Sequence, residues 1–243
     1  MNETLMQTLA ILSLIYPTYA FLSLLDRKTM DINSDKDLRI QTTGIREWDE
    51  EKRKLYHRTE STPYLALNTL VKKYPATQSD LLSGDLVDFG SGRGRVAIYL
   101  HSQMNVNVTG IEFHKETFEQ ANRNMNAYKN YAIYSSKKRI NFENIDARKY
   151  EIKKRDNKFF FFNPFNYEIF DEVLTNIKED AEKNSKKVQV ILYYKTRPYS
   201  KVMNKHKEFK KIKTIIPKGC LFYKERFTVY ELDCEEKGSL KQK

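Results

Sequence analysis

Cysteine and histidine are scarce in this chain of 243 residues. It contains two cysteines, Cys220 and Cys234, no Cys-x-x-Cys pair, and four histidines scattered over positions 57, 101, 114 and 206. Structural metal sites need several such ligands at short spacings, and oxidising compartments favour denser cysteine frameworks. The sequence therefore predicts a cytoplasmic protein, in a reducing environment, that has no structural metal site.

A basic segment is missing in front of the uncharged stretch at residues 4–25. A secretory signal peptide begins with such a segment, so we expect none here. The stretch has the length of a membrane-spanning helix, but Ser, Thr and Gln side chains dilute it and Pro17 divides it. We expect a helical extension that packs on the rest of the protein or on a second subunit. Membrane association through residues 4–25 is the alternative.

Acidic residues are too few to balance the basic ones, and the net charge is +11. Residues 1–127 carry 15 lysines and arginines against 16 acids, whereas residues 128–243 carry 28 against 16. Such an excess attracts a polyanion such as RNA, or an acidic protein surface, without specifying any chemistry. A solvated, lysine-rich surface is the alternative, because the lysines are spread over many predicted elements.

Internal repeats and low-complexity segments are absent, and apolar runs instead alternate with amphipathic stretches. We expect strands at 85–89, 106–113, 140–145, 158–162 and 188–194, and helices starting at 95 and 115 and covering 167–184. This alternation is typical of an α/β protein with a parallel sheet and helices on both faces. Two further strands, at 211–216 and 226–232, have no long helix between them and predict a final antiparallel hairpin.

The region before the first of these strands divides into two parts. Residues 26–58 are polar and charged, and we expect a surface segment with one short helix. Residues 59–64 predict a helix start, because hydroxyl side chains cap free amide groups and Pro63 suits a first turn. Apolar residues follow at helical spacing up to Pro75. We therefore divide the chain into an N-terminal extension, residues 1–58, and an α/β domain, residues 59–243.

Three glycines at alternate positions follow the strand at 85–89. Gly90, Gly92 and Gly94 let the backbone turn tightly and approach a ligand closely. A dinucleotide-binding loop has a third glycine at the place where this chain has Arg95, which disfavours a nicotinamide-dependent oxidoreductase. The loop is therefore expected to bind a different nucleotide cofactor.

This loop, with Asp88 two residues before it, resembles the first motif of class I S-adenosylmethionine-dependent methyltransferases. The resemblance implies a Rossmann-like, seven-stranded, mostly parallel sheet, with the antiparallel hairpin at its C-terminal edge. It also implies that S-adenosylmethionine is the cofactor, that Asp88 faces its cationic end, and that Glu112 accepts hydrogen bonds from the ribose hydroxyls. Asp146 would bind the adenine amino group, and the amide of Ala147 a ring nitrogen. The loop positions Gly90, Ser91, Gly92 and Gly94 complete this set.

The turn Asn163-Pro164-Phe165 resembles the Asp/Asn/Ser-Pro-Pro-aromatic turn of amino-group methyltransferases. In those enzymes the turn accepts hydrogen bonds from the target NH2 group, and its aromatic ring stacks on the substrate. The resemblance implies that Asn163, Pro164 and Phe165 receive the acceptor. This chain has one proline instead of two, so the alternative is that Phe165 closes the pocket and Asn163 caps the turn.

Residues 57–64 resemble the stretch that folds over the cofactor in lysine methyltransferases of this fold. That resemblance implies contacts from Glu60, Thr62 and Tyr64, with a capped helix as the alternative. We also expect Arg95 to start a helix near the site, available to an acidic substrate or to Glu60. Three residues after the strand at 188–194 are expected to line the acceptor channel: Lys195, Arg197 and Tyr199.

From residue 59 onward the chain resembles a bacterial group of class I methyltransferases with Thr-Glu-Ser-Thr-Pro-Tyr, Asp-Phe-Gly-x-Gly-x-Gly-Arg and Phe-Phe-Asn-Pro-Phe motifs. The sequence thus predicts an S-adenosylmethionine-dependent methyltransferase that acts on a nitrogen of a protein side chain or RNA base. The other hypothesis is a non-catalytic module that binds this cofactor and acts through its N-terminal extension.

Overall fold

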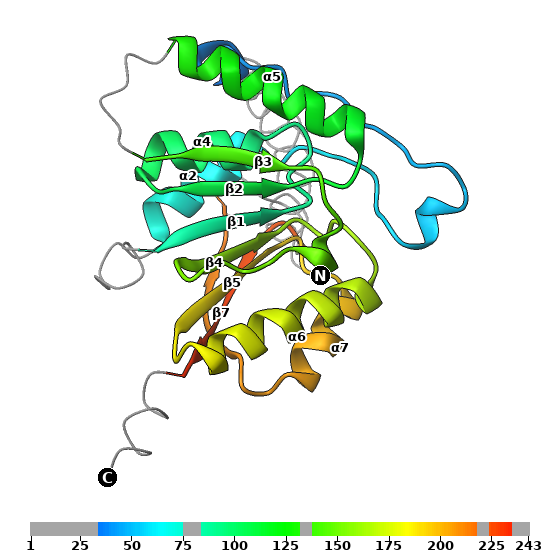
Figure 1. The fold of residues 1–243 in the computed structure, drawn as a ribbon, viewed down its shortest axis with the longest axis vertical. Helices are drawn as coiled ribbons and strands as arrows, with labels where there is room; N and C mark the ends of the chain where they lie inside the picture. Colours follow the sequence, from blue (N-terminus) through cyan, green and yellow to red (C-terminus); the bar gives the residue numbers. More distant parts are fainter. Residues whose placement is uncertain (1–33, 75–83, 132–137, 218–223, 235–243) are drawn as a thin grey trace, which may run out of the picture.

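A seven-stranded sheet forms the centre of the computed structural model, which describes residues 34–74, 84–131, 138–217 and 224–234 (Figure 1). The order of the strands is β3-β2-β1-β4-β5-β7-β6. Their bounds are Asp85–Phe89 (β1), Val108–Ile111 (β2), Ile140–Glu143 (β3), Asp156–Phe161 (β4), Lys187–Tyr193 (β5), Lys210–Ile215 (β6) and Phe227–Asp233 (β7). The first five strands are parallel, and β7 runs antiparallel to both β5 and β6. This is the predicted fold class, with the hairpin at the predicted edge.

Helices cover both faces of the sheet (Figure 1). The α-helices are Tyr64–Lys73 (α2), Arg95–Met104 (α4), Lys115–Tyr131 (α5), Tyr167–Lys183 (α6) and Arg197–Lys205 (α7), and two short 3-10 helices are Lys52–Lys54 (η1) and Ala147–Lys149 (η2). One buried cluster joins α6 and α7 to the sheet, and a second joins α2, α4 and α5 to it. The chain therefore folds as three layers, with an apolar core on each side of the sheet.

The central strand β4 is apolar at consecutive positions because both of its faces are buried. Phe159 and Phe161 belong to the cluster on the side of α6 and α7, while Phe160 belongs to the cluster on the side of α2 and α4. All three rings are fully buried. A strand buried on both faces has no polar side, which is the usual pattern in a parallel sheet. The order of the sheet places the carboxyl ends of β1 and β4 side by side.

Helix α7 was missing from the prediction. It spans nine residues and has Pro198 in its first turn. Its apolar residues therefore extend over about two helical turns, and lysines interrupt them. Tyr199, Val202 and Met203 face the core, and the remaining side is polar. A pattern this short gives a weak periodic signal, and its packing against α6 is a tertiary contact.

The prediction of a surface segment for residues 26–58 was wrong in part. Ile40, Trp48 and Tyr56 are each less than 9% exposed. Residues 40–60 form the long excursion beside the carboxyl ends of β1 and β2 (Figure 1). Most of its charged residues are exposed as predicted, but Arg46 is half-buried over the ring of Trp48, and the aromatic residues Trp48 and Tyr56 pack against the sheet. The division at residue 58 stays a prediction, and residues 4–25 lie outside the described residues.

Within the described ranges, no helix is both long enough and apolar enough to span a lipid bilayer. The same ranges contain no cluster of three or more side chains with metal-binding potential.

Candidate functional site

The glycine loop after β1 is held in a conformation that suits glycine. Gly90, Gly92 and Gly94 have φ values of 73°, 56° and 88°, a region that other residues adopt at a cost. A Cβ atom on Gly90 would lie 2.2 Å from the Cβ atom of Pro164. The loop therefore packs directly against the Asn163-Pro164-Phe165 turn, which comes from the neighbouring strand β4.

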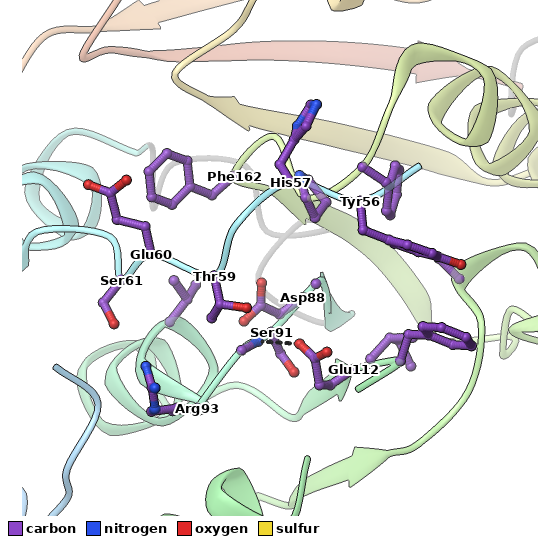
Figure 2. Close-up of a pocket in the computed structure, with 18 of the residues that line it drawn as sticks. Tyr56, His57, Thr59, Glu60, Ser61, Asp88, Ser91, Arg93, Glu112 and Phe162 are labelled. Carbon is purple, nitrogen blue, oxygen red and sulfur yellow. Dashed lines mark hydrogen bonds between the residues drawn. The ribbon is translucent and has the colours of Figure 1, made fainter. Parts of the chain in front are cut away.

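Glu112 ties the loop to the end of β2 (Figure 2). Its Oε2 atom accepts a hydrogen bond from the Gly92 amide at 2.9 Å, and its Oε1 atom accepts one from the His114 amide at 2.8 Å. Burial raises the pKa of this carboxyl group, and the two amide hydrogen bonds oppose that effect. Each carboxylate oxygen can accept a second hydrogen bond, so Glu112 can bind hydroxyl groups while it holds the loop.

Asp88, near the end of β1, is the most perturbed acid of the site. It is 2% exposed and lines the same pocket as Ser91 and Glu112. Burial, together with the negative charge of Glu112, raises the pKa of Asp88 to about 8. Its Oδ2 atom has no hydrogen-bond partner among the described residues, although it is buried. A buried acceptor of this kind is costly, and a cationic donor in the pocket would relieve the cost.

Residues 56–62, here called the strap, cross over the glycine loop (Figure 2). The His57 amide donates to the Pro164 carbonyl at 3.0 Å, and the strap residue Thr59 exchanges backbone hydrogen bonds with Arg46. A cavity of about 70 Å³, here called the first pocket, lies between the strap, the glycine loop and the strand ends. Thr62 lines it from the strap, and its buried hydroxyl group has no hydrogen-bond partner in the described chain.

The turn after β3 closes a third side of this first pocket. Ile145 and Ala147 line it. The side chain of Asp146 turns toward Arg148, whose Nη2 atom donates at 2.7 Å, and toward the hydroxyl of Tyr56 at 3.2 Å. Burial would raise the pKa of Asp146, but the hydrogen bonds from Arg148 outweigh it and the pKa is lowered. Asp146 therefore stays ionised beside the pocket.

Besides Asp146, two residues predicted to contact the cofactor do not line this pocket. Tyr64 is fully buried, and its hydroxyl donates to Oδ1 of Asp35 at 2.6 Å. Gly94 faces the ring of Phe142, which would lie 2.6 Å from an added Cβ atom. The aromatic ring of Tyr64 thus belongs to the core beneath the strap, and Gly94 serves the packing of α4 on the sheet.

Arg95 begins α4 and lines the first pocket, as expected for a helix start near the site. The expectation that its side chain is available to a substrate or to Glu60 is wrong. Its side chain is 3% exposed, and its Nη2 atom lies 3.5 Å from Oδ1 of Asp35. Its Nε atom donates to the hydroxyl of Thr42 at 2.6 Å. Asp35 was not predicted as a partner, because it lies sixty residues away in a segment expected on the surface. Glu60 instead pairs with Arg58 at 3.0 Å.

A second pocket, of about 690 Å³, lies on the other side of the strap. Asn163 lines it, with φ at 44°, and its Oδ1 atom accepts a hydrogen bond from the Thr196 hydroxyl at 3.4 Å. Pro164 and Phe165 line the first pocket instead. The turn is thus shared between the two pockets. The other residues of the second pocket are His57, Arg58, Glu60, Pro63, Phe162, Tyr193, Tyr194, Lys224 and Glu225.

The residues expected along the acceptor channel are distributed differently. Tyr199 is 1% exposed, its ring stacks on Phe170 at 4.0 Å, and its hydroxyl donates to the Phe165 carbonyl at 2.8 Å. It supports the turn from behind and lines neither pocket. Lys195 donates to the hydroxyl of Tyr230 at 2.8 Å, and Arg197 is exposed on α7.

Several lining residues were not predicted from the sequence. Trp48, Tyr56 and Phe113 form an aromatic wall of the first pocket, with the rings of Tyr56 and Phe113 stacked at 5.0 Å. Phe162 and Tyr193 meet edge to face at 4.8 Å in the second pocket. Phe113 and Phe162 had one sequence signal, since they are the last residues of the predicted strands 106–113 and 158–162, and ligands bind at such strand ends in open α/β sheets.

No family model matches the chain, and no curated protein is similar to it in sequence. Solved structures do resemble it. The magnesium protoporphyrin IX methyltransferase of Synechocystis PCC 6803, solved with SAM, has 14% identity and a TM-score of 0.52, and the match covers 87% of this chain and 97% of that one. The PH0226 protein of Pyrococcus horikoshii OT3 has 13% identity and a TM-score of 0.51, over 77% of this chain and 100% of that one.

A third match spans less than half of its counterpart. The tRNA (uracil-54, C5)-methyltransferase of Pyrococcus abyssi has 17% identity and a TM-score of 0.48, and the match covers 72% of this chain but 40% of that enzyme. At these identities the likeness concerns the fold. The chain has the class I methyltransferase fold, with two adjoining pockets at the carboxyl ends of its parallel strands.

Proposed function

We propose that this protein is an S-adenosylmethionine-dependent methyltransferase that methylates a nitrogen atom of a protein side chain or an RNA base. One observation carries the proposal. Asp88 with the glycine loop, Glu112 and the turn at Ala147 lie at the ends of three different strands, β1, β2 and β3, and border the same pocket. Open α/β sheets bind their ligands at this edge.

The residues of the first pocket fit this cofactor. Asp88 supplies a buried carboxylate oxygen without a partner in the described chain, suited to the cofactor's ammonium group. Glu112 has remaining acceptor capacity for the ribose hydroxyls, and Asp146 and Ala147 would border the adenine. Ser91 adds a buried hydroxyl group that likewise has no partner among the residues described. When bound, the cofactor supplies a methyl group on a positively charged sulfur atom.

The protein's own task is then to exclude water and to present the acceptor nitrogen with a free lone pair. Asn163 is the side chain placed for this task, because it lines the second pocket while its neighbours Pro164 and Phe165 line the first. Its amide oxygen would accept a hydrogen bond from the acceptor NH2 group. That bond would orient the nitrogen lone pair toward the methyl group.

The supporting residues hold this turn in place. Pro164 packs on Gly90 and accepts a hydrogen bond from the His57 amide, while Tyr199 binds the Phe165 carbonyl. Phe165 is 2% exposed and its ring meets Phe161 edge to face. In this proposal Phe165 closes the pocket on the core side and positions Asn163, instead of stacking on the substrate.

The test is transfer of a radiolabelled methyl group from S-adenosylmethionine to a host lysate that lacks this protein, followed by nuclease or protease treatment. We expect Asn163→Ala to abolish transfer and to leave cofactor binding nearly intact. Asn163→Gly is the matched control for backbone strain, since glycine tolerates the φ of 44°. It should lose transfer equally if the amide is what matters.

Three outcomes separate the candidates. Nuclease-sensitive label identifies an RNA or DNA acceptor, and protease-sensitive label identifies a protein. Cofactor binding without label in any fraction, unchanged by either variant, would favour the non-catalytic binding module. Absence of cofactor binding would contradict the proposal itself.

A further inference from the structure

Much of the net positive charge of this protein lies in one segment. Residues 195–217 contain eight lysines and arginines and one acid, Glu208. This segment forms α7 and β6. Five of its exposed cationic side chains, none of which forms a salt bridge with another described residue, are here called the basic face: Arg197, Lys201, Lys207, Lys210 and Lys211.

Helix α7 presents its cations on one side. Arg197 and Lys201 are four residues apart and therefore lie one above the other on the helix surface, opposite the buried Tyr199, Val202 and Met203. None of the salt bridges between described residues involves a member of the basic face. Lys205 differs, because Asp171 neutralises it at 2.5 Å.

The basic face begins at the second pocket. Thr196, just before α7, donates its hydroxyl to Asn163, and Tyr199 holds the Phe165 carbonyl. From that point the nine-residue helix extends for about 14 Å at 1.5 Å per residue. The pocket itself adds the half-buried rings of Phe162 and Tyr194. A row of cations thus leads to a cavity lined by flat aromatic side chains.

We propose that single-stranded nucleic acid docks on the basic face, with its phosphates on α7 and one base at the second pocket. This inference rests on the proposed function and names its acceptor class. Cations that follow the backbone, combined with rings that stack on bases, are the recurring means of binding single strands. An acidic protein would use the cations but has no need for the aromatic platform, so the observations favour the nucleic acid.

The experiment measures binding of a fluorescent oligouridylate to the whole protein across a salt series. The test variant is Arg197→Gln with Lys201→Gln. The matched control is Lys115→Gln with Arg123→Gln, which removes the same two charges from exposed positions of α5, on the opposite face of the sheet (Figure 1). Both pairs leave the β6 lysines in place.

We expect the test variant to lower the slope of log affinity against log salt by about 1.4, and to weaken binding at 0.1 M salt by about 25-fold, for two lost single-strand phosphate contacts. The control should bind like the wild type. Equal losses in both variants would overturn the proposal, since the attraction would then come from net charge alone. Oligothymidylate binding as well as oligouridylate would support it, because the phosphates are shared.

Binding of an acidic polypeptide distinguishes an acidic protein partner from a nucleic acid. If polyglutamate binds more tightly than oligouridylate, and loses that binding in the test variant, the basic face serves an acidic protein and the proposal is wrong. Calorimetry with S-adenosylmethionine on the same variants should show unchanged affinity. A failure to bind the cofactor in the wild type would instead contradict the proposed function.

Discussion

The buried carboxyl group of Asp88 makes cofactor affinity dependent on pH. Its pKa of about 8 means that it is mostly protonated in the free protein at neutral pH, whereas a cationic ligand group requires the carboxylate. The apparent affinity is reduced by the fraction of competent protein. That fraction is about 1% at pH 6 and about 9% at pH 7 for a pKa of about 8. We therefore expect S-adenosylmethionine to bind about tenfold more tightly at pH 7 than at pH 6.

Titration calorimetry between pH 6 and pH 7.5 measures this dependence. Repeating it at pH 7 in two buffers of different ionisation enthalpy should reveal the release of nearly one proton on binding. Asp88→Asn should bind more weakly, with no such pH dependence. A wild-type affinity that is constant over this range, together with no proton release, would refute the reasoning about Asp88.

Protonation of Asp88 has the opposite effect on the free energy of unfolding: cofactor affinity rises with pH, whereas stability falls. The folded pKa of Asp88 lies above its unfolded value near 4, so between these pH values the folded state binds the extra proton. Stability contributed by the neutral carboxyl group is therefore present at low pH and is lost as the pH rises toward about 8. In chemical denaturation, Asp88→Asn should lose less stability than the wild type over this interval.

Two other sites give contrasting predictions. Gly92→Ala should lower the free energy of unfolding by about 1–2 kcal/mol, because alanine is strained at a positive φ, and it should abolish cofactor binding. Gly90→Ala should lower that free energy by several kcal/mol, because the new Cβ atom would lie 2.2 Å from the Cβ atom of Pro164. Denaturant unfolding and calorimetry check both, and equal stability of the two variants would contradict the geometry. Tyr64→Phe should lower unfolding stability by about 1–3 kcal/mol, because buried Asp35 loses a donor. Its cofactor affinity should stay unchanged, and a large loss of affinity would place Tyr64 in the site after all.

The sheet and its hairpin were predictable because each strand of the core carries a local signal. The run from Phe159 to Phe161 is apolar without interruption, and the glycines after Phe89 mark where the strand ends. Helix α7 lacked such a signal, since its nine residues hold only three buried side chains. Its position depends on contacts with α6 that lie far away in the sequence.

The candidate site was predictable where function depends on strand ends. Asp88, Glu112 and Ala147 were predicted from a resemblance to motifs that lie at strand ends, and they border one pocket. The environment of Arg95 and Tyr64 was not predictable, because their partner Asp35 comes from a polar segment whose folding depends on burial of Ile40 and Trp48. Residues that are charged in sequence can thus become buried anchors when a distant carboxylate meets them.

The lysines of β6 have a further consequence at the edge of the sheet. β6 is the last strand in the order, and it pairs only with β7 within the described chain. An edge strand is a template for pairing with another molecule, and exposed lysines prevent this by repulsion and by their cost of burial. Lys210 and Lys211 are exposed here beside Ile212, which is 46% exposed. Acetylation of these two lysines would remove most of that charge, leave Lys213 as the one charged side chain of the strand, and weaken the protection of this edge against strand-by-strand self-association.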